Sequence, residues 1–187
     1  MFVRSQPGYT LVELLITLAI ALIVSVLAVP FYETIMQNSR MVARVNMVLG
    51  TLHYARGEAI KQRQQVSICD STDGATCTAS GNWELGWLVF VDADSSESFT
   101  AGDTVLKVYE SIAAGNATLR GDTNAQNVLS FSSDGFSRSA AGVLQTGNLV
   151  YCDSRGIASG KVITLTFIGR TRSYNPAAVG VTQCDPP

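Results

Sequence analysis

Residues 14–32 read LLITLAIALIVSVLAVPFY, and this stretch of nineteen residues contains no charged side chain. As an α-helix it would be about 28 Å long, which is close to the hydrocarbon thickness of a bilayer. The sequence therefore predicts one membrane-spanning helix over about residues 11–32. The remainder of the 187-residue chain is long enough for one modest domain but not for two.

The N-terminal segment allows three interpretations. A secretory signal would have a shorter apolar stretch followed by a small-residue cleavage site, and the sequence shows neither. A plain membrane anchor accounts for the length of the apolar run but leaves Glu13 unexplained. A carboxylate at the head of a membrane helix is costly and usually functional. A third interpretation accounts for both the length of the apolar run and the presence of Glu13.

Residues 6–15, QPGYTLVELL, resemble the type IV prepilin signature. The resemblance implies that a prepilin peptidase removes residues 1–8 as a leader, cutting between Gly8 and Tyr9, and methylates the new amine. Glu13 would then pair with the N-terminal amine of a neighbouring subunit, which compensates its charge in an apolar setting. We therefore expect a membrane-anchored pilin that contacts other major and minor pilins through its N-terminal helix.

The helix is expected to continue beyond the membrane segment, over residues 9–65 as a whole. Apolar residues recur at helical spacing and cations occupy the other faces, which indicates an amphipathic second half. The apolar positions are Ile35, Val42, Val45, Leu49, Leu52 and Ala59.

Residues 66–187 change to short β-type runs separated by turn-forming residues, which predicts a β-rich globular domain. The candidate strands are VSIC, GWLVFVD, TVLKVYE, NVLSFS, NLVYC and KVITLTFI. One long helix followed by repeated short strands is typical of the α+β class. We expect a pilin-like fold, with a long N-terminal helical stem packed on an antiparallel sheet.

Four cysteines allow three disulfide pairings, and their spacing matches no zinc motif. Disulfides place the domain in an oxidising compartment such as the periplasm. We favour Cys69–Cys77, which closes a short polar loop, together with Cys152–Cys184, which ties down the C-terminal tail. The spacing alone leaves the other pairings open.

The sequence offers little for an enzyme. It contains no hydrolase elbow, phosphate loop or HExxH motif, and its only histidine is His53 on the helical stem. The run DADSSESFTAGD contains oxygen ligands that would suit calcium, namely Asp92, Asp94, Glu97 and Asp103. It lacks the glycine and glutamate spacing of an EF-hand, so a solvated acidic loop is favoured. We expect no enzyme activity, no cofactor and no metal.

Four later segments resemble successive blocks of the FimT/GspH family of minor pilins and pseudopilins. They are GWLVFVDAD (86–94), SFSSDGFSR (130–138), LVYCDSRG (149–156) and TLTFIGRTR (164–172). The resemblance covers nearly the whole chain. It implies a low-copy subunit that initiates or caps a filament.

The net charge of −2 hides a strong asymmetry along the chain. Residues 70–134 contain ten acidic and two basic residues, whereas residues 135–175 contain five basic residues and Asp153 alone. A local basic patch, and not the net charge, governs contact with phosphates. The basic segment is therefore the candidate for binding a polyanion.

Within it, the segment GRTR at 169–172 resembles the GRxR motif of FimT-type pilins, which bind DNA during natural transformation. By this resemblance Arg170 and Arg172, projecting from a loop after the strand TLTFI, would grip the DNA backbone, and Gly169 would shape the turn. Guanidinium groups fork onto phosphate oxygens, so the contacts would be independent of base sequence. Weaker candidates, chosen for their place in the basic segment, are Lys161, Arg155 and Arg138.

The leading hypothesis is a minor pilin that binds extracellular DNA for uptake (competence). It would sit in the bacterial inner membrane as a single-pass protein with a periplasmic domain and then enter the pilus at the cell surface. Two alternatives remain. The chain could be a GspH-like pseudopilin of a type II secretion system, or a minor pilin that only primes pilus assembly, with GRTR as surface charge.

Overall fold

The computed structural model describes residues 8–185, apart from the side chains of residues 27–31. The helix and strands in this part of the chain are α1 Leu11–Gln62, β1 Gln65–Asp70, β2 Trp87–Asp92, β3 Thr104–Tyr109, β4 Thr118–Gly121, β5 Val128–Phe131, β6 Gly147–Cys152, β7 Lys161–Leu165 and β8 Thr171–Tyr174. Short 3-10 helices span Trp83–Leu85, Ile157–Ser159 and Pro176–Val179. The chain divides into two compact units, residues 1–40 and 41–187, and α1 contributes to both.

The N-terminal unit begins α1 with a hydrogen-bonded cap. Thr10 Oγ1 accepts a hydrogen bond from the backbone N–H of Glu13 (3.2 Å), and the Thr10 carbonyl oxygen accepts one from the N–H of Leu14 (3.2 Å). A threonine followed three residues later by glutamate is the capping-box pattern. Glu13 also places a negative charge at the positive end of the helix dipole. The TLVE segment thus provides a local reason for the helix to start at Leu11.

The predicted membrane segment lies in this unit. Large apolar side chains from Leu11 to Val26 are exposed. The segment also includes residues 27–31, whose side chains lie outside the described part of the chain. Residues 1–7 of the predicted leader lie outside it entirely. Among the described residues, no helix has both the length and the apolar character needed to cross a membrane. The membrane segment therefore stays a prediction.

In the second unit, α1 buries one apolar stripe. It consists of Met41, Val45, Val48, Leu52, Ala55 and Ala59, at alternating spacings of four and three residues. The predicted stripe was partly wrong, because Ile35 and Val42 are about half exposed (49% and 54%) and Leu49 is only partly buried. Successive side chains on a helix point about 100° apart around its axis. The spacing of apolar residues therefore does not fix which of several close positions faces the core.

The helix ends at Gln62, three residues before the predicted end. Arg63 adopts a left-handed conformation with φ of 55°, and β1 begins two residues later. A left-handed residue after the last helical turn terminates a helix because it redirects the backbone. This reversal starts the β-rich part of the chain.

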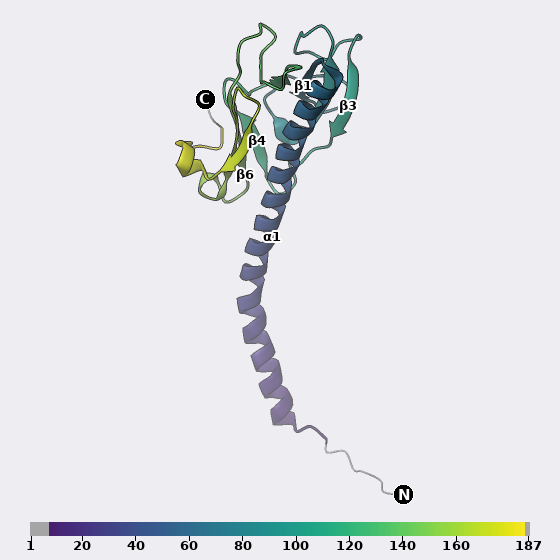
Figure 1. The fold of residues 1–187 in the computed structure, drawn as a ribbon. Coiled ribbons are helices and arrows are strands. Elements are labelled where there is room, and N and C mark those ends of the chain that lie inside the picture. The colour runs from purple at the N-terminus through teal and green to yellow at the C-terminus, as the bar shows by residue number, and fades with distance from the viewer. Residues whose placement is uncertain (1–7, 186–187) are drawn as a thin grey trace, which may run out of the picture. The chain divides into compact units, whose positions relative to one another are not determined.

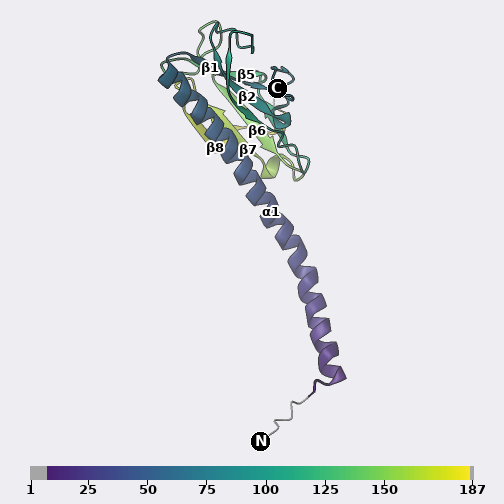
Figure 2. The same ribbon diagram turned by 90° about the vertical axis from the view of Figure 1, so that its right-hand side faces the viewer.

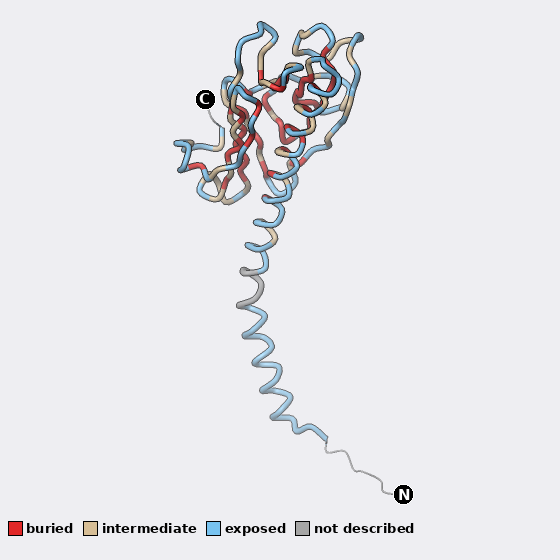
Figure 3. Tube along the Cα trace, in the orientation of Figure 1, coloured by how far each residue is buried: buried red, intermediate tan, exposed pale blue. Residues whose placement is uncertain are grey.

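The strands form two four-stranded antiparallel sheets, with strand orders β3-β2-β1-β5 and β4-β6-β7-β8. Around the C-terminal turns of α1, β3 lies to one side and β4 and β6 lie to the other (Figure 1), and β7 and β8 run beside the helix (Figure 2). Buried residues gather on the strands and on the helix face toward them (Figure 3). The α+β pilin-like fold is therefore confirmed. The short polar strands β4 (TLRG) and β8 (TRSY) were missed in the sequence.

Two disulfides are present, Cys69–Cys77 and Cys152–Cys184, with Cα–Cα distances of 5.6 and 5.9 Å. This is the favoured pairing of the three. The second bond holds the C-terminal tail over the sheet, where Val181 and Cys184 pack against the buried side chain of Val162. The tail therefore covers part of the sheet face opposite α1.

Candidate nucleic-acid interface

The GRTR segment forms the turn and the start of the second strand of the β7–β8 hairpin. The Gly169 N–H donates to the Thr166 carbonyl oxygen (2.8 Å), and the Thr166 N–H donates to the Arg170 carbonyl oxygen (2.9 Å). Gly169 has φ of 72°, a left-handed conformation that favours glycine. A tight turn followed by such a residue is a common hairpin connection. A turn does follow the predicted strand and includes Gly169 and Arg170, but β7 ends earlier than predicted, at Leu165, and Arg172 belongs to β8 and not to the loop.

A second turn of the same kind, residues 132–136, lies directly against this hairpin. Its Gly135 carbonyl oxygen accepts a hydrogen bond from Arg56 Nε of α1 at 2.9 Å. A Cβ atom on Gly169 would stand 2.2 Å from that oxygen and 2.8 Å from Arg56 Nε. Position 169 therefore favours glycine for two reasons: the backbone is left-handed there, and a Cβ atom would clash with Gly135 and Arg56.

Arg170 and Arg172 extend from the face of the hairpin that is turned away from α1. Side chains alternate along a strand, so Thr171 points inward and is buried while its two neighbours are exposed. Thr164 lies opposite Arg172 on β7. This outer face holds an open groove of about 180 Å³, lined by Thr164, Thr166, Ile168, Arg170, Arg172 and Tyr174.

The two guanidinium groups are available to a ligand. Within residues 8–185, no carboxylate forms an ion pair with Arg170 or Arg172. A guanidinium presents several N–H donors in a planar fork that matches phosphate oxygens. The pair therefore offers an anion site with no competing carboxylate among the described residues.

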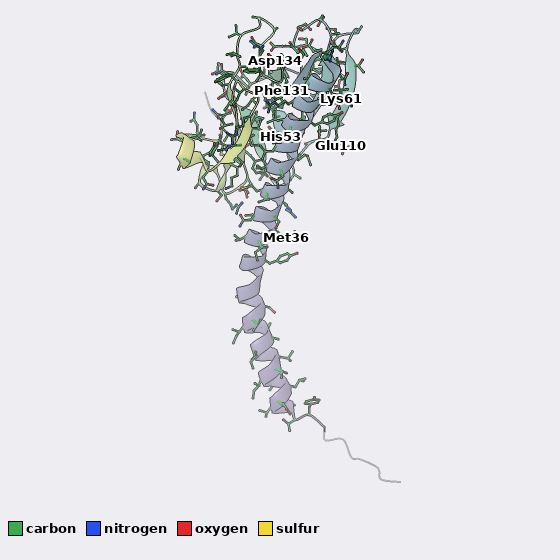
Figure 4. The ribbon with its side chains drawn as sticks, viewed as in Figure 1. Met36, His53, Lys61, Glu110, Phe131 and Asp134 are labelled. Atoms are coloured by element: carbon green, nitrogen blue, oxygen red, sulfur yellow. A yellow bond between two sulfur atoms is a disulfide. The ribbon has the colours of Figure 1, made fainter. Side chains whose placement is uncertain are left out.

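The inner face of β8 is tied to the helix. His53 of α1 lies beside the strands (Figure 4), and its Nε2 shares a hydrogen bond of 3.2 Å with Thr171 Oγ1. This contact and the bond from Arg56 to the neighbouring turn hold the hairpin on α1. The site residues therefore stand on a rigid support, which is what a binding surface requires.

The three weaker candidates lie outside the groove and are already engaged. Arg155 pairs with Asp153 at 2.7 Å, Arg138 pairs with Asp134 at 3.3 Å, and Lys161 Nζ donates to Asn175 Oδ1 at 2.6 Å. Hydrogen bonds from Arg155 hold the pKa of Asp153 below its ordinary value, and the carboxylate raises the pKa of Arg155. The structure thus brings only Gly169, Arg170 and Arg172 of the predicted set together.

Three neighbours of the site were missed in the sequence: His53, Arg56 and Tyr174. Spacing of three residues places His53 and Arg56 near one another on a helix. Nothing in the sequence links that helix face to residue 169, more than a hundred positions away. Tyr174 was missed because β8 was not recognised as a strand.

The processing residues lie in the N-terminal unit, away from these contacts in sequence. Gly8 and Tyr9 are exposed and precede α1, and Glu13 is exposed in its first turn. Its backbone N–H donates the capping bond to Thr10, and within residues 8–185 its carboxylate forms no ion pair. Its carboxylate is thus available for the pairing that the prepilin resemblance implies.

The acidic loop after β2 is organised by its own carboxylates. Oxygens of Asp92, Asp94 and Asp103 lie within 4.8 Å of one another. Buried Asp92 accepts hydrogen bonds from the Ser67 hydroxyl (2.7 Å) and from the backbone N–H of Glu97 (3.0 Å). Burial raises the pKa of Glu97. These bonds give the cluster a role in ordering the loop, and the absence of a metal stays a prediction.

Two family models match the chain. Residues 44–169, more than half of the chain, match the family described as type II transport protein GspH. Residues 3–29 match the prokaryotic N-terminal methylation motif. Arg170 and Arg172 lie just beyond the first match. No curated protein sequence matches.

Two solved structures are similar, both of the type IV minor pilin FimU from Pseudomonas aeruginosa strain PAO1. One, in space group P21, aligns with a TM-score of 0.58 and 22% identity over 75% of this chain and 92% of that chain. The other, in space group P65, aligns with a TM-score of 0.51 and 23% identity over 68% of this chain and 87% of that chain. At this identity the likeness shows the fold alone.

The family match, the methylation motif and the pilin fold agree with one another. Pilins and pseudopilins are structural proteins and not enzymes, which agrees with the sequence-based expectation. The chain belongs to the GspH family of type IV minor pilins and pseudopilins.

Proposed function

We propose that this chain is a minor pilin of a type IV pilus that binds extracellular DNA for uptake in natural transformation. The observation that carries the proposal is the pair Arg170 and Arg172, exposed on one face of a hairpin and without a carboxylate partner among the described residues. Gly169 shapes the turn that carries them. Contacts to phosphates would be independent of base sequence.

With only two arginines in contact with phosphates, DNA binding by one subunit should depend only moderately on salt concentration. Each phosphate contact on duplex DNA contributes about 0.9 to the slope of log affinity against log salt concentration. Two contacts thus predict a slope of about −1.8 for one subunit. Affinity should be weak for a single domain and should increase when several subunits share one DNA molecule.

The test is a titration of labelled duplex DNA with residues 38–187 at several salt concentrations. This truncated chain keeps every buried apolar side chain of the described core. The double variant Arg170→Ala/Arg172→Ala should lose most of the binding and nearly all of the salt dependence. Circular dichroism would check that the variant is folded.

A matched control removes two positive charges elsewhere. Lys61 lies in the last turn of α1 and Lys107 lies on β3 of the other sheet, and both are exposed. Lys61→Ala/Lys107→Ala should retain most of the wild-type affinity. Absence of binding by folded wild-type protein at low salt would refute the DNA proposal, and equal losses in the two double variants would refute the assignment to the hairpin.

The family description supports a second candidate, a GspH-like pseudopilin of a type II secretion system. In that case the hairpin would be surface charge on a subunit that serves protein export. The same would hold for a pilin that only primes pilus assembly. Deleting the gene and measuring DNA uptake, secretion and piliation in parallel would separate the three.

The N-terminal part of the proposal concerns processing and location. Cleavage by a prepilin peptidase between Gly8 and Tyr9, followed by methylation, would leave Glu13 near the new terminus. The protein would be anchored in the inner membrane by the apolar part of α1 before it joins a filament. Mass spectrometry of the purified full-length protein should find N-methylated Tyr9 first. Glu13→Ala should still be cleaved but should fail to enter filaments.

A further inference from the structure

We infer that the groove on the outer face of the β7–β8 hairpin accepts unpaired nucleotides, so that the protein binds single-stranded DNA more tightly than duplex. The inference rests on the DNA-binding function proposed above and names the form of DNA that this site prefers. The arginines would hold the backbone, and bases would rest on the ring of Tyr174 and the side chain of Ile168.

The order of side chains along the hairpin supports this assignment. Ile168, Arg170, Arg172 and Tyr174 follow one another at every second position and all line the groove. Arg172 and Tyr174 are two residues apart on β8, which places their side chains about 6.6 Å apart on one face, and Ile168 and Arg170 come from the preceding turn. The groove therefore combines an apolar side chain, two cations and an aromatic ring, whereas a site for phosphates alone would need only the cations.

The aromatic end is held in place. Tyr174 lies opposite Val162 on β7, and Val162 is buried beneath the C-terminal tail. The Cys152–Cys184 disulfide fixes that tail. A half-buried ring with one side supported loses little freedom when a base stacks on its open side, which favours binding.

The groove suits an unpaired strand better than a duplex. In a duplex the base faces are covered by their neighbours, so the hairpin could reach only phosphates and sugars. Single-stranded DNA exposes base faces as well, and stacking on aromatic rings tolerates every base. The volume of about 180 Å³ is below that of typical small-molecule pockets of about 300 Å³ or more. It suits one base of a longer chain and not a whole free ligand.

The test compares labelled oligothymidine with a matched duplex, titrated with wild-type protein, Tyr174→Leu and Tyr174→Phe. Leucine removes the aromatic face but keeps an apolar side chain, and phenylalanine keeps the ring without the hydroxyl. We expect Tyr174→Leu to weaken single-strand binding about 5-fold to 100-fold, which is the range for loss of one stacked base, and to leave duplex binding unchanged. Tyr174→Phe should bind like the wild type.

Phe167→Leu is the matched control, because Phe167 is a partly exposed ring in the same turn that does not line the groove. It should not alter the preference for single strands. Loss of both DNA forms in Arg170→Ala/Arg172→Ala, with Tyr174→Leu like the wild type, would overturn this inference and leave the proposed function standing. Absence of all binding by wild type would overturn both. If Tyr174→Leu binds normally but fails to enter filaments, the groove is a pilin contact and the inference is wrong.

Discussion

Gly169 and Gly135 lie in direct contact, since a Cβ atom built on Gly169 would stand 2.2 Å from the Gly135 carbonyl oxygen. These glycines occupy the left-handed positions of two hairpin turns that are 34 residues apart in sequence. Arg56 Nε donates to the same oxygen and joins both turns to α1. The hairpin that carries the candidate DNA-binding arginines is thereby positioned through a neighbouring turn and the helix.

This contact predicts that Gly169→Ala is more destabilising than an ordinary glycine replacement in a turn. The left-handed backbone costs about 1–2 kcal/mol for a residue with a Cβ. The clash with Gly135 and Arg56 adds to that cost, so we expect about 3 kcal/mol or more in the free energy of unfolding, measured with urea.

Gly142 provides the control for this variant. It occupies the same position of a similar turn, with φ of 74°, and nothing lies within 4 Å of its Cβ position. Gly142→Ala should therefore lower the free energy of unfolding only by the cost of the left-handed backbone, about 1–2 kcal/mol. Equal losses of stability in the two variants would show that the contact between the two turns contributes nothing.

The two disulfides should differ in their contribution to stability. Cys152–Cys184 joins residues 32 positions apart, and Cys69–Cys77 joins residues 8 positions apart. In the chain-entropy model the longer loop contributes about 4 kcal/mol and the shorter about 2.5 kcal/mol. Urea denaturation of the two double cysteine-to-alanine variants should rank them in this order. The reverse order would point to packing around the short loop as the larger effect.

Asp153 should make stability depend on acid pH. Its pKa is lowered in the folded protein, first by hydrogen bonds from Arg155, so the folded state holds the charged form more firmly than the unfolded chain does. The resulting stabilisation is present above the unfolded pKa of about 3.9 and is lost as the pH falls through the lower folded value. Nuclear magnetic resonance of the side-chain carboxyl should detect the lowered pKa.

The variant Arg155→Met tests the cause of that shift. Without the guanidinium, the pKa of Asp153 should rise, because burial of the carboxyl then acts with less opposition. The part of the stability loss on acidification that comes from Asp153 should therefore be smaller than in the wild type. An unchanged Asp153 titration in the variant would rule out Arg155 as the main cause.

Asp92 should be the most sensitive carboxylate of the acidic loop. It is buried and accepts hydrogen bonds from Ser67 and from the backbone of residues 96 and 97. Asp92→Asn removes the charge that strengthens these bonds, and we expect a loss of about 2–3 kcal/mol in the free energy of unfolding. The exposed neighbour Asp94 is the control, and Asp94→Asn should change the free energy of unfolding far less than Asp92→Asn. Similar losses would mean that the cluster acts as one unit.

The amino-acid sequence by itself determined the features that depend on neighbouring residues in the chain. The apolar run predicts a long N-terminal helix, and the β-branched runs predict six of the eight described strands. The resemblance to the GRxR motif implied that Gly169 shapes a turn, and its left-handed φ of 72° is a conformation that favours glycine. These preferences are local, so they can be read without the fold.

Only the tertiary structure decided which basic residues are available to a ligand. Arg138 and Arg155 pair with Asp134 and Asp153, which are four and two residues away in the chain. Arg170 has no carboxylate partner among the described residues, and this depends on every element that packs near the hairpin. The fold likewise brings Arg56 from α1, and Tyr174 lies on a strand too short and polar to be recognised in the sequence. The contact between Arg56 and residue 135 joins residues that are remote in the chain, and folding alone sets such distances.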